Sequence, residues 1–124
     1  MTSHQHRREP IRVEAADELG RAGPQAQDAV DVLVKSLHDK AVRVRMAAAE
    51  ALGRINPVSE SAIEGLIQAL QDEDVGPRMA AVRALHRIGP RAHAAIPFVR
   101  RALSDPDVGV RWWAEDALAD LSRP

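Results

Sequence analysis

The sequence repeats itself along its length with a period of 33 residues and no gap. Four arginines, four alanines and four leucines recur at this interval, and an aspartate recurs in three of the units. These are Arg12, Arg45, Arg78 and Arg111; Ala15, Ala48, Ala81 and Ala114; Leu19, Leu52, Leu85 and Leu118; and Asp39, Asp72 and Asp105. A period of this length is typical of a solenoid, in which short units stack because none can bury its apolar face alone.

Each unit divides into two predicted helices. The first, helix A, is expected at about residues 42–55, where apolar residues fall at helical spacing on one face. It ends where a residue that tolerates left-handed geometry precedes proline, as at Gly23-Pro24, Asn56-Pro57 and Gly89-Pro90. The second, helix B, is expected at about residues 61–71, and Pro97 falls in the first turn of its third copy, where proline costs little. Asp74 and Asp107 are the predicted N-caps of the next helices A.

The chain is therefore predicted to be all-α, a right-handed α-α superhelix of about three and a half helical hairpins. We expect residues 10–124 to form a single repeat domain after a disordered tail at residues 1–9. The 17 basic and 18 acidic residues nearly balance, so the total charge favours neither nucleic acid nor an anionic membrane as a partner.

The units resemble HEAT repeats of the short kind that also occurs in phycobilisome lyases. The resemblance covers residues 11–122 and rests on segments such as residues 44–55, VRMAAAEALGRI, and on turns such as residues 70–75, LQDEDV. It implies that the aspartate of each turn pairs with the arginine at the start of the next helix A. The matching pairs are Asp39 with Arg45, Asp72 with Arg78, and Asp105 with Arg111. Arg12 has no preceding aspartate, so we expect it to lack this pairing; we interpret the repeated charges as structural.

Little in the sequence points to catalysis. There is no cysteine, no glycine-rich phosphate loop, and no His-Glu dipeptide of the kind that HEAT-type iron hydroxylases carry. We predict no catalytic residue, no cofactor and no metal site. No apolar run reaches the roughly 18 residues of a membrane span, and the amino terminus lacks the apolar core of a secretory signal, so we expect a cytoplasmic protein.

Three departures from the repeat are candidate functional features, and the first is charge. No acidic residue occurs between Val75 and Ser104, whereas six arginines occur there: Arg78, Arg83, Arg87, Arg91, Arg100 and Arg101. Helical geometry directs these side chains to different faces. We therefore favour contact with an acidic protein, or with neighbouring acidic repeats, over nucleic acid.

The second departure is the pair Trp112-Trp113, which replaces the Met-Ala pairs of the two preceding helices A. The two rings could close the end of the solenoid as a cap, or they could anchor a partner. Both interpretations stay open. A second copy of the chain that met this helix through a two-fold axis would form a weak homodimer.

The third departure is an apolar series on the outer flank of helix A. Its members are Val13, Met46, Met79 and Trp112. We favour packing between adjacent helices A, because Gly20 and Gly53 on the same flank allow a close approach. The alternative is an exposed ridge suited to self-association.

The predicted function is a non-enzymatic protein-protein interaction scaffold that uses the inner row of helices B. Helical phase exposes Asp28, Asp31, Lys35 and His38 in the first repeat, Ser61, Glu64, Gln68 and Gln71 in the second, and Ala94, Pro97, Arg101 and Ser104 in the third. These positions vary while the buried ones repeat, and their charge changes from acidic to basic along the row. The alternatives are a phycobilisome-lyase-type enzyme or enzyme subunit, and nucleic-acid binding through the basic third repeat.

Overall fold

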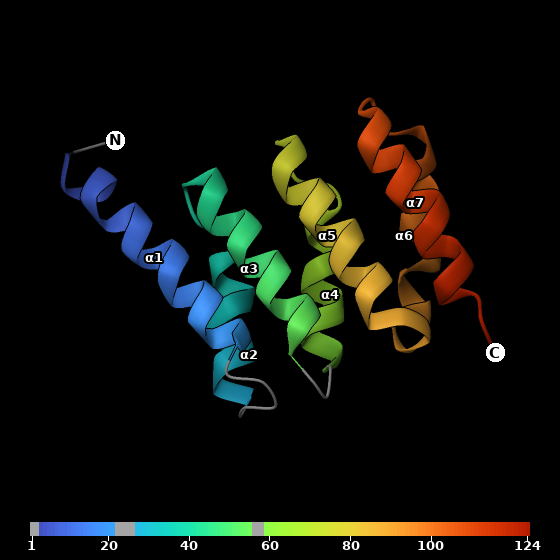
Figure 1. Ribbon diagram of the computed structural model, residues 1–124, viewed down its shortest axis with the longest axis horizontal. Helices are drawn as coiled ribbons and strands as arrows, with labels where there is room; N and C mark the ends of the chain where they lie inside the picture. The colour runs from blue at the N-terminus through green and yellow to red at the C-terminus, as the bar shows by residue number, and fades with distance from the viewer. Residues whose placement is uncertain (1–2, 22–26, 56–58) are drawn as a thin grey trace.

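The protein is a two-layered stack of antiparallel helices. The computed structural model describes residues 3–21, 27–55 and 59–124, and no strand occurs in these ranges. One layer, the helix-A row, contains α1 (Ser3–Arg21), α3 (Val42–Arg54), α5 (Val75–Ile88) and α7 (Val108–Leu121). The helix-B row behind it contains α2 (Gln27–Ser36), α4 (Glu60–Ala69) and α6 (Ile96–Arg101), and α1 and α7 lie at opposite ends of the stack (Figure 1). The predicted all-α solenoid is confirmed.

The ends of the helices follow the predicted punctuation where the structure describes them. Gly89 ends α5 with φ of 77°, a left-handed conformation that glycine adopts without strain. The equivalent Gly23-Pro24 and Asn56-Pro57 pairs lie outside the described residues. Asp107 caps α7, because its carboxylate accepts a hydrogen bond from the Val110 N–H at 3.0 Å. Asp74 also occupies the N-cap position, at the start of α5, but its carboxylate contacts Arg45 instead.

Two segments differ from the sequence prediction. Helix α1 begins at Ser3 and runs through Pro10, so residues 3–9 are helical and not the disordered tail that we expected. Glutamine, arginine and glutamate in this stretch are good helix formers, which explains the extension. In the third repeat the helix-B segment is split into a 3-10 turn η1 (Gly89–Ala95), α6, and a short 3-10 turn η2 (Ala102–Ser104), and Pro97 lies in the first turn of α6 as predicted.

The core lies between the two rows and is made of the repeated residues. Leu33, Leu66 and Val99 occupy the same position in successive helix-B segments, and each is fully buried. The helix-A row contributes Leu52 and Leu85, which are also fully buried. Because every unit presents the same small set of apolar side chains, each one fits the surface of the next.

Adjacent helices of the helix-A row pack very closely in the first three units. A Cβ atom added at Gly20 would lie 2.8 Å from Ala51, and one added at Gly53 would lie 2.8 Å from Ala84. Glycine is needed at both positions because no side chain fits between the helices.

The apolar series on the flank packs between these helices, as predicted. The Sδ atom of Met46 lies against Gly76 of α5, and the Cε atom of Met79 lies against Gly109 of α7, so that an added Cβ at either glycine would be 2.6 Å away. Trp112 occupies the equivalent position on α7 and is 58% exposed. Within the described part of the chain, no further helix A lies beyond α7 to cover it.

Candidate functional site

The repeated arginines join the turns of successive units, but through a different pairing from the predicted one. Arg12 Nε donates to Asp39 Oδ2 at 2.9 Å, Arg45 Nε to Asp72 Oδ2 at 3.0 Å, and Arg78 Nε to Asp105 Oδ2 at 2.9 Å. Each aspartate lies 27 residues after its arginine. The predicted side-chain pairs of Asp39 with Arg45, Asp72 with Arg78, and Asp105 with Arg111 are therefore wrong, and so is the expectation that Arg12 stays unpaired. The hairpin returns the chain beside its own helix A, which brings the following turn into reach.

The preceding turn is contacted too, through its backbone. Arg45 Nη1 donates to the Asp39 carbonyl oxygen at 2.8 Å, and Arg78 Nη1 donates to that of Asp72 at 3.0 Å. Arg111 Nη1 donates to the Asp105 carbonyl oxygen at 2.7 Å and makes no ion pair with a described residue. Arg45 and Arg78 thus each hold two consecutive turns together, which is a structural role.

Asp39 shows how this network affects a carboxylate. Burial alone raises its pKa, but the hydrogen bonds from Arg12 and from the Ala41 N–H, with the charges of Arg12 and Arg45, outweigh burial and lower the pKa overall. The same contact raises the pKa of Arg12, mainly through its hydrogen bond to Asp39. The ion pair therefore favours the charged forms of both groups.

The helix-B row carries the predicted partner-binding residues at its surface. All eight such residues on this row are exposed: Asp28, Asp31, Lys35, His38, Glu64, Gln68, Gln71 and Arg101. Gln71 and Arg101 come together at a small hollow of about 100 Å³ between the second and third repeats. The Arg101 guanidinium lies there over the Phe98 ring, 5.3 Å from its centroid.

The six arginines of the basic segment do not form one surface. Arg78 is engaged with Asp105, Arg83 and Arg87 stand on α5 in the helix-A row, and Arg100 and Arg101 belong to α6 in the helix-B row. This division agrees with the geometric expectation, and it leaves no continuous basic stripe for a nucleic-acid backbone.

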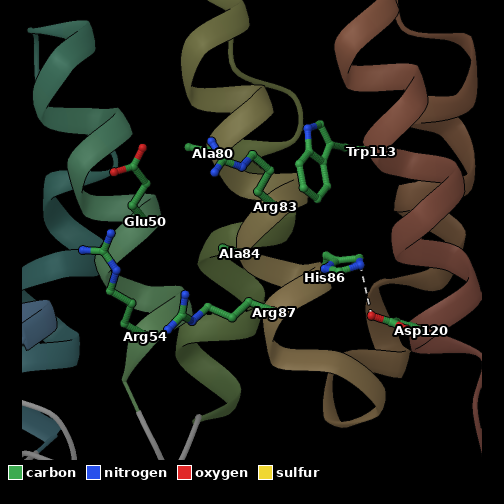
Figure 2. A pocket seen from close by; sticks show the side chains of 9 residues that line it. All are labelled: Glu50, Arg54, Ala80, Arg83, Ala84, His86, Arg87, Trp113 and Asp120. Carbon is green, nitrogen blue, oxygen red and sulfur yellow. Dashed lines mark ion pairs between the residues drawn. The ribbon is translucent and has the colours of Figure 1, made fainter.

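A larger hollow, of about 520 Å³, lies on the opposite side of the molecule, over α3, α5 and α7 (Figure 2). It is lined by Glu50, Arg54, Ala80, Arg83, Ala84, His86, Arg87, Trp113 and Asp120. Sequence reasoning did not predict this site. The signal for it is His86, which stands where the two preceding helices A have Gly20 and Gly53.

His86 changes the contact between α5 and α7. Its Nε2 atom lies 2.9 Å from Asp116 Oδ2 and 3.0 Å from Asp120 Oδ2, so the imidazole bridges two carboxylates of α7. The Trp113 ring meets the imidazole edge to face at a centroid distance of 5.5 Å, and the Arg83 guanidinium lies 5.3 Å from the Trp113 centroid. Polar and aromatic side chains thus replace the close glycine contact of the earlier repeats.

The two tryptophans differ in exposure. Trp113 is half-buried against His86 and Arg83 of the neighbouring helix α5. Trp112 packs against the edge of Trp113 at 5.0 Å and remains 58% exposed.

Comparison with known proteins gives the family. The family profile described as HEAT repeats matches residues 3–74 and again residues 63–124, which together span nearly the whole chain. The chain belongs to the HEAT-repeat family. No curated protein sequence matches it.

Solved structures with a similar fold include an engineered protein and a phycocyanin lyase complex. The crystal structure of an engineered protein matches with a TM-score of 0.63 and 26% identity, over 88% of this chain and 55% of that one. The complex of CpcE and CpcF of phycocyanin lyase from Nostoc sp. PCC7120 matches with a TM-score of 0.63 and 22% identity, over 94% of this chain and 61% of that one. The HEAT-repeat chain thus spans little more than half the length of each of these proteins.

Two further features of the HEAT-repeat chain concern only its described ranges. No helix there is both long and apolar enough to cross a lipid bilayer. No group of three histidine, cysteine or carboxylate side chains there is placed to hold a metal ion.

Proposed function

We propose that this HEAT-repeat chain is a binding module that holds a protein partner along its helix-B row. The observation that carries the proposal is the contrast between two positions of the repeat. Leu33, Leu66 and Val99 are apolar and fully buried, whereas Lys35, Gln68 and Arg101, two residues further along each helix, are exposed and differ in charge. A scaffold with a fixed interior and a variable face is suited to recognition.

The charge along this face supports a specific orientation of the partner. Asp28 gives the first repeat an exposed carboxylate, and Arg101 gives the third an exposed guanidinium next to the Phe98 ring. A partner with a basic segment near α2 and an acidic segment near α6 would complement both ends. Such complementarity fixes the register of the complex and raises its association rate.

Affinity capture with matched variants tests the proposal. We expect the wild-type chain to retain a partner from the lysate of its own organism, and an Asp28→Lys, Arg101→Glu variant, which reverses the charge at both ends of the row, to retain about tenfold less by quantitative mass spectrometry. A Glu115→Lys, Arg91→Glu control carries the same change of charge at exposed positions outside the predicted set. Equal retention by all three proteins would contradict a role for the helix-B row.

A second candidate function is a subunit of a lyase of the phycocyanin type. It is favoured by the fold similarity to the complex of CpcE and CpcF of phycocyanin lyase. This candidate predicts that the chain carries or transfers a chromophore, which would appear as visible absorbance in the protein purified from its own organism. A colourless protein that still retains a protein partner favours the binding module.

A further inference from the structure

Two positions on the outer side of helix A carry an unusual arrangement of charge in the third and fourth units. The first two helices A place a carboxylate four residues before an arginine, as Asp17 with Arg21 and Glu50 with Arg54. In α5 both positions are arginine, Arg83 and Arg87, and in α7 both are aspartate, Asp116 and Asp120. Like charges at this spacing destabilise a helix, so each pair needs a counter-charge.

Among the described residues only the aspartate pair has a close counter-charge, because Arg123 Nη2 lies 2.9 Å from Asp120 Oδ1. His86 lies between Asp116 and Asp120, within 3.0 Å of an oxygen of each. Arg83 contacts the Trp113 ring, and neither Arg83 nor Arg87 forms an ion pair with a described residue. Arg54 on α3 also forms no ion pair in the described ranges.

These three arginines surround one hollow. Its floor is formed by Ala80 and Ala84 of α5, and the Trp113 ring stands on the α7 side (Figure 2). A volume of about 520 Å³ is within the range of natural ligand sites, and an apolar floor with a few charged groups is their usual lining. Three guanidinium groups supply many N–H donors in a fixed planar geometry that matches carboxylates.

We propose that this hollow binds an acidic segment of a protein. Carboxylates of the segment pair with Arg54, Arg83 and Arg87, and an apolar side chain of the segment packs on Trp113 and the alanine floor. The site lies on the opposite row from the helix-B surface and does not depend on it. The bound segment gives the like-charged arginines of α5 the counter-charge that the described residues do not supply.

The rims of the hollow favour an acidic peptide over a nucleic acid. Glu50 stands on the α3 side and Asp120 on the α7 side, with Asp116 beside it. A phosphate backbone carries a charge at every nucleotide, so it would be repelled where it left the hollow across either rim. A peptide can place its carboxylates in the hollow and neutral residues at the rims.

The test uses Trp113 as the reporter. The sequence has two tryptophans, so a Trp112→Phe background leaves Trp113 as the single one. The probe is an acetylated and amidated peptide, Gly-Glu-Leu-Glu-Glu-Gly, which has three carboxylates, one apolar side chain and neutral ends. Titration with this acidic peptide at low salt should change the Trp113 fluorescence with a saturable dependence on peptide concentration. The same peptide with lysine in place of glutamate should produce no such change.

Arg83→Glu is the decisive variant, because it restores the carboxylate-arginine spacing of Glu50 and Arg54 and should leave the melting temperature unchanged or higher. We expect it to weaken binding of the acidic peptide about tenfold or more. Arg91→Glu changes the charge equally at an exposed position of the same repeat outside the hollow, and should weaken binding less than about twofold.

Three results would overturn the proposal: no saturable response of the Trp113 fluorescence, an equal loss in the Arg83→Glu and Arg91→Glu proteins, or tighter binding of an oligothymidylate of the same charge that is lost in Arg83→Glu. The last result would assign the hollow to nucleic acid. The captured partner of the helix-B row plays no part in this assay, so the two proposals fail separately.

Discussion

The contact of α3 with α5 and the contact of α5 with α7 are built from the same repeat positions, yet they differ in character. In the first, Gly53 lies directly against Ala84, and no side chain separates the helices. In the second, His86 stands at the glycine position and connects α5 with Asp116, Asp120 and Trp113. The first contact packs the two helices directly against each other, whereas the second leaves charged and aromatic side chains around a hollow. The exceptions to the repeat are therefore the best candidates for recognition.

Removing an arginine that joins two turns should produce the largest loss of stability. Arg78→Ala leaves Asp105, which is only 8% exposed, without its partner and also breaks the bond to the Asp72 carbonyl. We expect the free energy of unfolding to fall by about 2–4 kcal/mol, measured by denaturant unfolding.

Two controls sharpen this comparison. Arg111→Ala removes only contacts to carbonyl oxygens and should cost about 1 kcal/mol, and Arg83→Ala, on the exposed side of α5, should cost less. Equal and small losses in all three variants would show that the ladder of arginines and aspartates does not hold the units together.

The close contact of α3 with α5 can be tested by adding a single methyl group. In Gly53→Ala the new Cβ would lie 2.8 to 2.9 Å from the Cβ and Cα of Ala84, so the helices must separate, and we expect a loss of about 1–3 kcal/mol in denaturant unfolding. In Gly109→Ala the nearest atom is the flexible tip of Met79, so this control should be nearly neutral. A neutral Gly53→Ala would mean that the helix-A row is not closely packed there.

The amino-terminal ion pair predicts a dependence of stability on pH. Because the folded protein lowers the pKa of Asp39 below the ordinary value of 3.8, the ion pair with Arg12 stabilises the fold above that value, and this contribution is lost as the pH falls through the lowered pKa. Asp39→Asn should therefore be less stable than wild type at neutral pH, and the difference should shrink below about pH 4. A difference that stays constant down to pH 2 would exclude this origin.

The smallest expected effect concerns self-association through α7. Trp112 is 58% exposed on this helix, and we expect sedimentation of the wild-type chain to show a weak dimer that Trp112→Glu abolishes. Ile11→Glu, at a 65% exposed apolar position of α1, is the matched control and should still associate. A wild-type chain that remains monomeric at high concentration would leave Trp112 as a surface residue without this role.

The fold could be predicted from the sequence because the period constrains nearly every buried position. The predicted bounds of helix A at residues 42–55 agree with α3, and the left-handed Gly89 follows from the Gly-Pro pattern. The split helix-B segment of the third repeat was less predictable, since Pro90 and Pro97 favour short turns there without determining their type.

The pairing of the arginines could not be read from spacing. In a perfect repeat every arginine has an aspartate 6 residues before it and another 27 residues after it, and the period makes these two patterns inseparable. In the structure the arginine donates both to the backbone carbonyl oxygen of the preceding aspartate and to the carboxylate of the following one.

The hollow over α5 was missed for a related reason. The sequence identifies Arg83 and Trp113 as departures from the repeat, but it does not show that they lie beside His86 around one hollow. Their meeting depends on how α5 and α7 are placed side by side, which a single sequence does not specify.

We infer that the repeated residues form a scaffold and that the exposed residues that vary recognise a partner. The most direct measurement is a titration of the isotope-labelled chain with its captured partner, followed by nuclear magnetic resonance. We predict shifts concentrated on the exposed positions of α2, α4 and α6, including Lys35, Gln68 and Arg101, without a change in helix content. If a saturating concentration of the partner leaves these resonances unchanged, or shifts only those of α1, the helix-B row does not recognise the partner.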